Sequence, residues 1–213
     1  MRLFLALVLT AAPALAEDRP VLDPAARAEP GAVALYLQAQ GLAALGQAAK
    51  DPLMVLTAAR LLHGLRLTDT PRQPDPAPAA ATPLTAPDAA RLLDIARRLD
   101  AGLTYSDLSD LLTREVPPAP RILRATASTL KPGQSEVWTL PFFGGSQAEL
   151  AILGDGRSNL DMVVTAADDT HICLDKGSSD TAYCGFALVD NGDVRITISN
   201  VGPAPDTYLL LTE

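Results

Sequence analysis

Few side chains in this sequence could do chemistry, and they do not make up a complete catalytic motif. The 213 residues include two histidines, and neither H-E-x-x-H nor G-x-S-x-G is present. We expect His63 to end a helix and His171 to lie on a strand, so the two cannot share a metal site. Ser128 and Lys131 match S-x-x-K, but the Pro-Gly pair that follows predicts a turn where that motif needs a buried helix. We therefore assign no catalytic residue and expect a protein that is not an enzyme.

Cys173 and Cys184 are the only cysteines, and ten residues separate them. In an oxidising compartment, an even and closely spaced pair predicts a disulfide, here between two neighbouring strands joined by a loop. Closing so short a loop would stabilise the fold by roughly 2–3 kcal/mol. The alternative is a redox-active pair, which usually has C-x-x-C spacing. We expect the structural disulfide.

Residues 1–16 have the pattern of a cleavable secretory signal peptide. Arg2 supplies the positive charge, residues 3–12 form an apolar run, and Ala14 and Ala16 place small residues at the −3 and −1 positions of a cleavage site. The run is shorter than the roughly twenty residues of a membrane-spanning helix, and no later segment is long and apolar enough. We expect a soluble mature chain that begins near Glu17 and is periplasmic or secreted.

The composition excludes several classes of partner. The formal net charge is −8, and removal of Arg2 with the signal peptide makes it −9. Nucleic acid and anionic lipid surfaces both need a basic protein surface. Aromatic residues make up 4% of the chain, which leaves little material for stacking on sugars or bases. We therefore expect no nucleic acid partner.

The spacing of apolar residues divides the chain into two parts, and in the first part it is the spacing of helices. Residues 31–116 have apolar groups at the spacing of about four helices, including Leu35, Leu42 and Leu45 in the first. Asp51-Pro52 is a good start for the second helix. A third helix is expected to open at Pro87. Residues 70–87, within the helical range 31–116, are rich in proline, and we expect them to form an exposed loop.

The second pattern is that of short strands separated by turn residues, and it follows a linker at 117–120. The expected strands are 121–129, 135–141, 147–153, 160–166, 170–175, 182–189, 193–199 and 206–212. Eight strands at this spacing predict an antiparallel sandwich, jelly-roll-like in form. The fold class is therefore α+β with two domains: an extended segment at 17–30 leads into a small helical bundle at 31–116, and a β-sandwich occupies 121–213.

The C-terminal half also carries an ordered set of short motifs. They are Phe143-Gly144-Gly145, Gly154-Asp155-Gly156, Leu160 to Val164, the cysteine pair, Arg195 to Gly202, and Tyr208 to Thr212. This ordered set resembles the bacterial pre-peptidase C-terminal domain, a β-sandwich often appended to secreted proteases. The resemblance implies a sandwich over about residues 121–213 with a non-catalytic role, and the helical half has no counterpart in it.

Relatives of that domain can bind calcium through acidic turns, so the resemblance also implies a set of candidate oxygen ligands. They are Asp155, Asn159 and Asp161, with Asp168 and Asp169 one strand away. Resembling loops often carry acids where this chain has Arg157 and Asn159, which lowers the negative charge. We expect ordinary solvated turn carboxylates here rather than a calcium site, and we expect no other cofactor.

These observations predict an exported, soluble, non-enzymatic binding or protein-interaction module of the bacterial cell envelope. Its partner would be another envelope protein or an extracellular ligand, and the chain would not span a membrane. Two alternatives stay open. One is a hydrolase with an atypical acidic site at the helix–sheet boundary, and the other is a calcium-dependent adhesion module.

Overall fold

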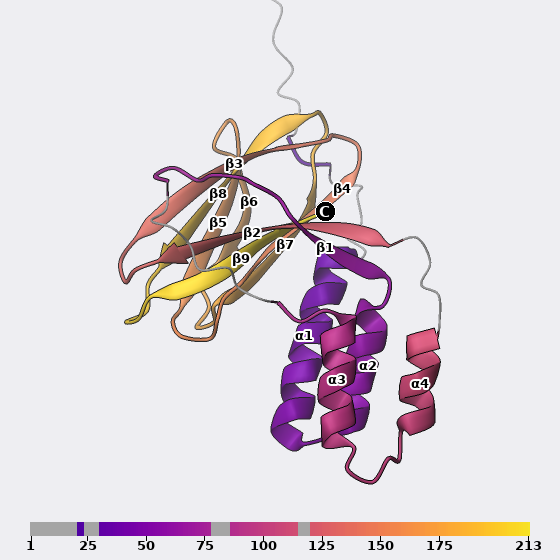
Figure 1. Ribbon diagram of the computed structural model, residues 1–213. Coiled ribbons are helices and arrows are strands. Elements are labelled where there is room, and N and C mark those ends of the chain that lie inside the picture. Colours follow the sequence, from indigo (N-terminus) through magenta and orange to yellow (C-terminus); the bar gives the residue numbers. More distant parts are fainter. Residues whose placement is uncertain (1–20, 24–29, 78–85, 115–119) are drawn as a thin grey trace, which may run out of the picture.

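The computed structural model describes residues 21–23, 30–77, 86–114 and 120–213, and the expected signal peptide lies outside them. Figure 1 shows a two-sheet sandwich with a group of helices against one side, which confirms the α+β class. The helices within these ranges are α1 (Ala32–Ala49), α2 (Pro52–Leu62), α3 (Ala89–Leu99) and α4 (Ser106–Arg114). The strands are β1 (Leu65–Asp69), β2 (Arg121–Leu130), β3 (Ser135–Phe142), β4 (Gln147–Leu153), β5 (Leu160–Ala166), β6 (His171–Asp175), β7 (Thr181–Ala187), β8 (Gly192–Asn200) and β9 (Asp206–Thr212).

Helices α2 and α3 begin at aspartate side chains that cap their free amides. The carboxylate of Asp51 accepts hydrogen bonds from the amides of Leu53 and Met54, at 2.9 and 3.2 Å, so the predicted start of α2 is confirmed. Asp88 caps α3 in the same way. The buried face of α1 differs from the expected one: Tyr36 is fully buried, whereas Leu45 is 63% exposed. The face of α1 that contains Tyr36 is rich in alanine, which lets neighbouring elements pack closely against it. The leucine positions did not predict this face.

Strands β2 to β9 have the strand order of a jelly roll. One sheet runs β1-β2-β9-β4-β7 and the other β3-β8-β5-β6, so successive strands from β2 to β5 alternate between sheets. Each pairing among β2 to β9 is antiparallel. The predicted sandwich is therefore confirmed, with nine strands in the described ranges rather than eight.

The additional strand is β1, which comes from the part of the chain that we expected to be helical. It pairs with β2 in parallel, from Leu65 opposite Arg121 to Asp69 opposite Ala125. Parallel neighbours need a long crossover, and the segment with α3 and α4 supplies it. Strand β1 has five residues and directly follows α2, so its alternation of apolar and polar residues is too short to be recognised in the sequence.

After β1 the chain crosses from one sheet to the other through residues 70–77, which we call the strap. The amide of Asp75 donates to the carbonyl of Val137 on β3, and the Val137 amide donates back, at 2.8 and 2.9 Å. In Figure 1 the strap runs from β1 across to β3. The first part of the proline-rich loop is thus held by a bridge to β3, while residues 78–85 lie outside the described ranges.

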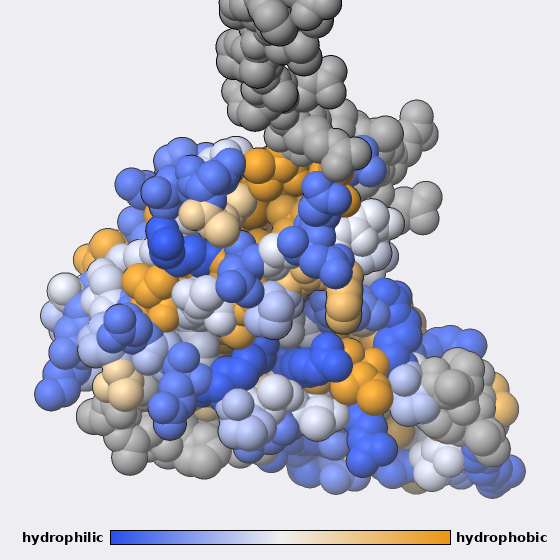
Figure 2. Space-filling view, turned by 90° about the horizontal axis from the view of Figure 1, so that it is seen from above, coloured by the Kyte–Doolittle hydropathy of each residue, from blue (hydrophilic) through white to orange (hydrophobic). Residues whose placement is uncertain are grey.

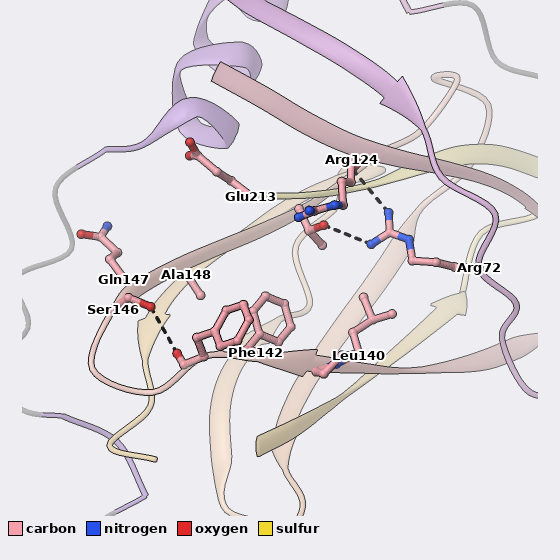
Figure 3. Close-up of a pocket in the computed structure, with 11 residues that line it drawn as sticks. Arg72, Arg124, Leu140, Phe142, Ser146, Gln147, Ala148 and Glu213 are labelled. Carbon is pink, nitrogen blue, oxygen red and sulfur yellow. Dashed lines mark hydrogen bonds between the residues drawn. The ribbon is translucent and has the colours of Figure 1, made fainter. Parts of the chain in front are cut away.

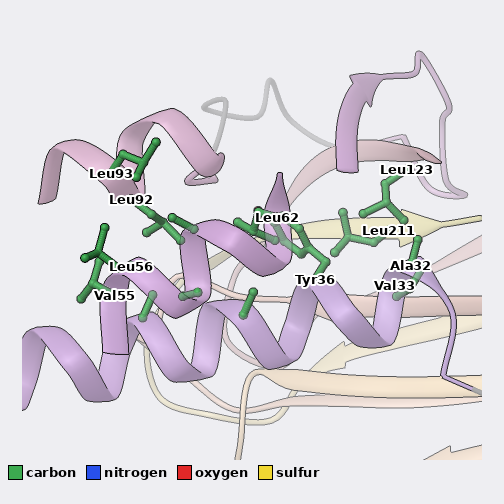
Figure 4. Close-up of a cluster of buried hydrophobic side chains, with 14 of the residues drawn as sticks. Ala32, Val33, Tyr36, Val55, Leu56, Leu62, Leu92, Leu93, Leu123 and Leu211 are labelled. Atoms are coloured by element: carbon green, nitrogen blue, oxygen red, sulfur yellow. The ribbon is translucent and has the colours of Figure 1, made fainter. Parts of the chain in front are cut away.

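Two apolar cores share the five-stranded sheet. One lies between the sheets and includes Trp138, Ile152 and Leu210, whereas the other lies between the helices and the outer face of the sheet. Figure 4 shows this second core as a continuous row from Leu92 of α3 to Leu211 of β9. Burying both faces of β4 and β9 fixes the helices against the sandwich, because a side chain on either face lies in a packed interior.

A cationic pocket at the edge of the sandwich as the candidate site

A pocket of about 440 Å³ lies beneath the strap, where β3 ends and β4 begins. Figure 3 shows Arg72 reaching into it from the strap, Arg124 beside it on β2, and Leu140 and Phe142 on the opposite wall. Its full lining is Arg72, Arg124, Leu140, Pro141, Phe142, Phe143, Ser146, Gln147, Ala148, Thr212 and Glu213. The volume lies within the range of about 300–1,000 Å³ that is typical of small-molecule sites.

The guanidinium of Arg72 is held on the five-stranded sheet by neutral oxygens. Its Nε donates to the hydroxyl of Thr126 at 2.7 Å, and Nη1 donates to the hydroxyl of Thr212 at 3.0 Å. Its Nη2 donates to the carbonyls of Arg124 and Leu210, at 3.3 and 3.2 Å. These contacts fix the guanidinium across β2 and β9, and they leave one of its five N–H groups available.

The positive charge at this end of the pocket is not balanced. Among the described residues, no carboxylate lies within ion-pair distance of Arg72 or Arg124. Burial, and to a smaller extent the charge of the neighbouring Arg124, lowers the pKa of Arg72 to about 10. Glu213 also lines the pocket, but both of its oxygens bond to the Arg121 guanidinium, at 2.9 and 2.7 Å. An anion would therefore meet two guanidiniums whose charge is not cancelled by any carboxylate of the described ranges.

The opposite wall is apolar. The ring of Phe142 packs edge-on against Phe186, with the ring centroids 5.1 Å apart, which fixes its orientation. Phe143 stands at the rim with 77% of its surface exposed. Figure 2 shows that apolar side chains also reach the surface elsewhere, in areas bordered by hydrophilic residues. The pocket thus combines a fixed cationic end with an aromatic wall.

A second constellation lies at the helix–sheet boundary, where the first turn of α1 meets carboxylates of the sheet. Glu149, 2% exposed, accepts from the amides of Gly31, Val33 and Ala34, at 2.5, 2.9 and 3.4 Å. The amide of Ala32 donates to Glu213 at 2.8 Å. All four free amides of this helix start are thus bonded to carboxylates of the sheet.

These boundary carboxylates are occupied by structural contacts. Glu149 also accepts from the hydroxyl of Tyr183 at 2.6 Å, and burial together with the Glu149 charge raises the pKa of that hydroxyl. Glu213 is shared between Ala32 and Arg121. The arrangement joins the helices to the sheet and leaves neither carboxylate poised as a catalytic acid or base.

A third constellation is a polar network inside the sandwich core. Glu136 accepts from the hydroxyls of Ser128 and Tyr208, and the Trp138 Nε1 donates to the Tyr208 oxygen at 2.8 Å. Burial raises the pKa of Glu136 although these hydrogen bonds oppose the rise. Ser128 lies on β2 and is fully buried, so it is not at the start of a helix as S-x-x-K chemistry requires. The predicted turn after it contains Gly133 with φ of +74°.

The candidate calcium ligands lie at both ends of β5. Asp155, Asn159 and Asp161 lie before and at the start of the strand, whereas Asp168 and Asp169 lie after it. A seven-residue strand separates its two ends by roughly 20 Å. Within the described ranges, no group of three or more His, Cys, Asp or Glu side chains is arranged to hold a metal ion. The five residues do not form one cluster; solvated turn carboxylates stay the prediction from the sequence, with calcium binding as its alternative.

The carboxylates near Asp155 hold the turn between β4 and β5. Asp206, fully buried, accepts from the amides of Asp155 and Ser158, at 3.3 and 2.9 Å. Asp180 accepts from the amide of Gly156 at 2.5 Å. Burial, and then the charges of Asp155 and Asp180, raise the pKa of Asp206.

At the far end of β5, the other two candidates have local partners. Asp168 accepts from the amide of Thr170 at 3.0 Å, and this contact lowers the pKa of Asp168. Asp169 pairs with Arg195 at 2.6 Å. Asp168 therefore stabilises the turn after β5, and Asp169 binds an arginine of the neighbouring strand β8.

Cys173 and Cys184 are placed to form a disulfide, with their Cα atoms 5.9 Å apart. Cys173 lies on β6 of the four-stranded sheet and Cys184 on β7 of the five-stranded sheet. The bridge would thus join the two sheets at one edge, while the strap joins them at the opposite edge. The expectation of two strands joined by a loop is correct, but the strands lie in different sheets.

The two histidines lie where the sequence placed them. His63 is the residue that ends α2, and His171 is the first residue of β6. They belong to the helical part and the sandwich respectively. Neither lines the pocket.

The sequence did not identify the residues of the pocket. Arg72 lies in a proline-rich segment that we expected to be an exposed loop, and only the strap places its guanidinium on β2 and β9. Glu149 did leave a signal, because it is a lone acid in an otherwise apolar predicted strand. A carboxylate in such a strand needs bonded partners, and the helix amides supply them.

Comparison with known proteins gives a likeness of fold. No protein family model matches the chain, and no curated protein matches its sequence. Solved structures similar to the chain include a pre-peptidase C-terminal domain of collagenase from Bacillus anthracis, with 13% identity and a TM-score of 0.37. That match covers 42% of this chain and 87% of the other.

Two further structures have lower TM-scores. PliG from Aeromonas hydrophila, a periplasmic inhibitor of g-type lysozyme, has 16% identity and a TM-score of 0.32, over 43% of this chain and 86% of that one. A carbohydrate-binding module, CBM36, in complex with calcium and xylotriose, has 8% identity and a TM-score of 0.25, over 40% and 76%. At these values the likeness concerns a sandwich alone. Membership of the pre-peptidase family stays a prediction from the motifs.

Proposed function

We propose that this protein is an exported, non-enzymatic binding module of the bacterial cell envelope, and that it binds its ligand or partner in the pocket beneath the strap. The observation that carries the proposal is the pocket itself. It combines the rigidly held guanidinium of Arg72 and the exposed guanidinium of Arg124, neither of which is paired with a carboxylate among the described residues, with an aromatic wall. Its volume suits a small ligand or a projecting group of a larger one.

The surroundings of the pocket support a binding role. Its cationic end is held by hydrogen bonds to two strands, and its aromatic end by a ring contact in the sandwich core. A site whose groups are already positioned loses little conformational entropy on binding. Export is supported by the signal-peptide pattern and by the placement of the two cysteines. Among the described residues, no helix has the length and apolar character needed to cross a bilayer.

Native mass spectrometry of the full chain, isolated from the envelope fraction of a producing bacterium, tests this proposal. We expect an additional non-covalent mass that is lost on denaturation. Phe143→Ser at the pocket rim should remove it, and Leu174→Ser should retain it, because Leu174 is 62% exposed on the other sheet. Equal retention by both variants, or repeated isolation of the bare chain, would contradict the proposal. Turnover of a substrate by the purified protein would favour the hydrolase alternative instead.

A further inference from the structure

The ligand chemistry of the pocket follows from the donors at its cationic end. Arg72 has one N–H group left after its four hydrogen bonds to neutral oxygens. Arg124 is exposed, and within the described residues its guanidinium makes no hydrogen bond or ion pair, so its fork of donors is available. Figure 3 shows both arginines at the same end of the pocket, and Arg124 is close enough for its charge to act on Arg72. Adjacent forked donors of this kind match the paired oxygens of a carboxylate.

The rest of the lining determines which kind of molecule can bear the carboxylate. Leu140, Phe142 and Ala148 form an apolar wall, and Phe143 extends it to the rim. A small, fully hydrated anion such as phosphate would leave this wall in contact with water. An apolar or aromatic body would cover it, and each buried methylene would contribute about 0.8 kcal/mol.

Resting on the proposed function, we infer that the pocket binds an organic acid: a carboxylate on Arg72 and Arg124, carried by an apolar or aromatic body on the wall of Leu140, Phe142 and Phe143. The carboxylate supplies the counter-charge that the two guanidiniums lack. The body takes the place of water on the aromatic wall. Glu213 does not repel the ligand strongly, because its charge is paired with that of Arg121.

Isothermal titration of the purified full chain with phenylacetate tests this inference. We expect phenylacetate to bind at least tenfold more tightly than phenylacetamide, which lacks the charge, and than acetate or inorganic phosphate, which lack the apolar body. N-acetylphenylalanine and its amide form a further pair. Tighter binding of this acid than of phenylacetate would identify a peptide C-terminus as the source of the carboxylate, and the reverse order a free organic acid.

Arg124→Gln should weaken phenylacetate binding about tenfold, whereas Arg98→Gln, an equivalent change at an exposed site on α3, should leave it unchanged. NMR of the wild-type protein gives a readout that needs no variant: the Arg72 Nε–H and Phe142 ring signals should shift during the titration. Equal affinity for acid and amide, equal affinity for phosphate, or no binding at millimolar concentration would overturn the inference. If an envelope-derived ligand is nevertheless retained and lacks a carboxylate, the ligand class is wrong and the proposed function stands.

Discussion

At the scale of single residues, three buried carboxylates do different work. Glu149 joins two parts of the chain that are more than a hundred residues apart in sequence, since its oxygens accept from the start of α1. Glu136 is enclosed in the sandwich core with two hydroxyl donors. Asp206 holds the turn before β5. In each case the surrounding donors explain why an acid is tolerated in an interior.

Glu149→Gln should destabilise the protein by about 2 kcal/mol, because hydrogen bonds to a charged acceptor contribute roughly 1.5–3 kcal/mol. The glutamine retains one acceptor and turns an NH₂ group towards helix amides that are themselves donors. Urea unfolding measures the change. Asp94→Asn, at an exposed site on α3, is the matched control and should stay within about 0.5 kcal/mol of wild type. Equal stability of the two variants would show that Glu149 does not hold α1.

Glu136→Gln should flatten the dependence of stability on pH. The pKa of Glu136 is raised in the folded state, so above the unfolded value of about 4.3 the native state holds more protons than the unfolded one. Wild-type stability should therefore fall as the pH rises from that value through the folded pKa. Asp206 has a raised pKa too and contributes a fall of the same sign.

The glutamine cannot ionise but still offers hydrogen-bond partners to Tyr208 and Ser128. The stability of the Glu136→Gln variant should therefore fall less with rising pH than that of wild type. At pH 7 the variant should be more stable than wild type by about 1 kcal/mol. Thermal unfolding between pH 4 and 8 measures this. Asp193→Asn, at an exposed position on β8, should follow the wild-type curve. A Glu136→Gln curve as steep as that of wild type would contradict the assignment.

At the scale of elements, sequence pattern was sufficient for most of the structure. The alternation in 193–199 predicted β8 closely, and Asp51-Pro52 marked the start of α2. Strand β1 was missed because its side chains, Leu-Arg-Leu-Thr-Asp, occupy a short edge strand that only its pairing with β2 defines. The strap was missed for a related reason, since proline-rich sequence does not reveal which strand edge it will meet.

Arg72→Met should loosen the strap and destabilise the fold by about 2 kcal/mol, because four hydrogen bonds to β2 and β9 are lost. Hydrogen exchange should become faster at the amides of Asp75 and Val137, which form the bridge to β3. Arg66→Met is the matched control, since Arg66 lies exposed on β1 and makes no contact of this kind among the described residues. Unchanged exchange at the bridge in the Arg72 variant would show that the arginine does not hold the strap.

At the scale of the whole molecule, the two sheets are joined at both edges and one of them is covered by helices. The run Leu209-Leu210-Leu211 is apolar on both faces of β9, and the helices cover Leu209 and Leu211 while Leu210 lies between the sheets. Such a run indicates a strand buried on both sides, although it does not say what covers it. The pocket depends on this larger arrangement, since its lining comes from the strap, β2, β3, β4 and β9.

A disulfide between Cys173 and Cys184 would link the two sheets covalently and so affect the stability of the whole sandwich. After export, we expect intact-mass measurement to show a chain lighter by two hydrogens than its reduced form, and a mature N-terminus near Glu17. Replacing both cysteines with serine should lower stability by roughly 2–3 kcal/mol under oxidising conditions. Under reducing conditions, the difference from wild type should be much smaller. Free thiols in the exported protein would contradict the structural disulfide.

Site-specific photo-crosslinking would show whether this protein meets its ligand or partner in the pocket beneath the strap. A benzophenone amino acid would replace Phe143 at the pocket rim or, as the control, Leu174 on β6, and bacteria exporting the full chain would be irradiated. Both positions are well exposed, so a benzophenone at either one can reach surrounding molecules to a similar extent. We expect one discrete adduct from position 143 that excess phenylacetate suppresses, and no such adduct from position 174. Equal labelling at both positions, or a discrete adduct only at 174, would contradict it.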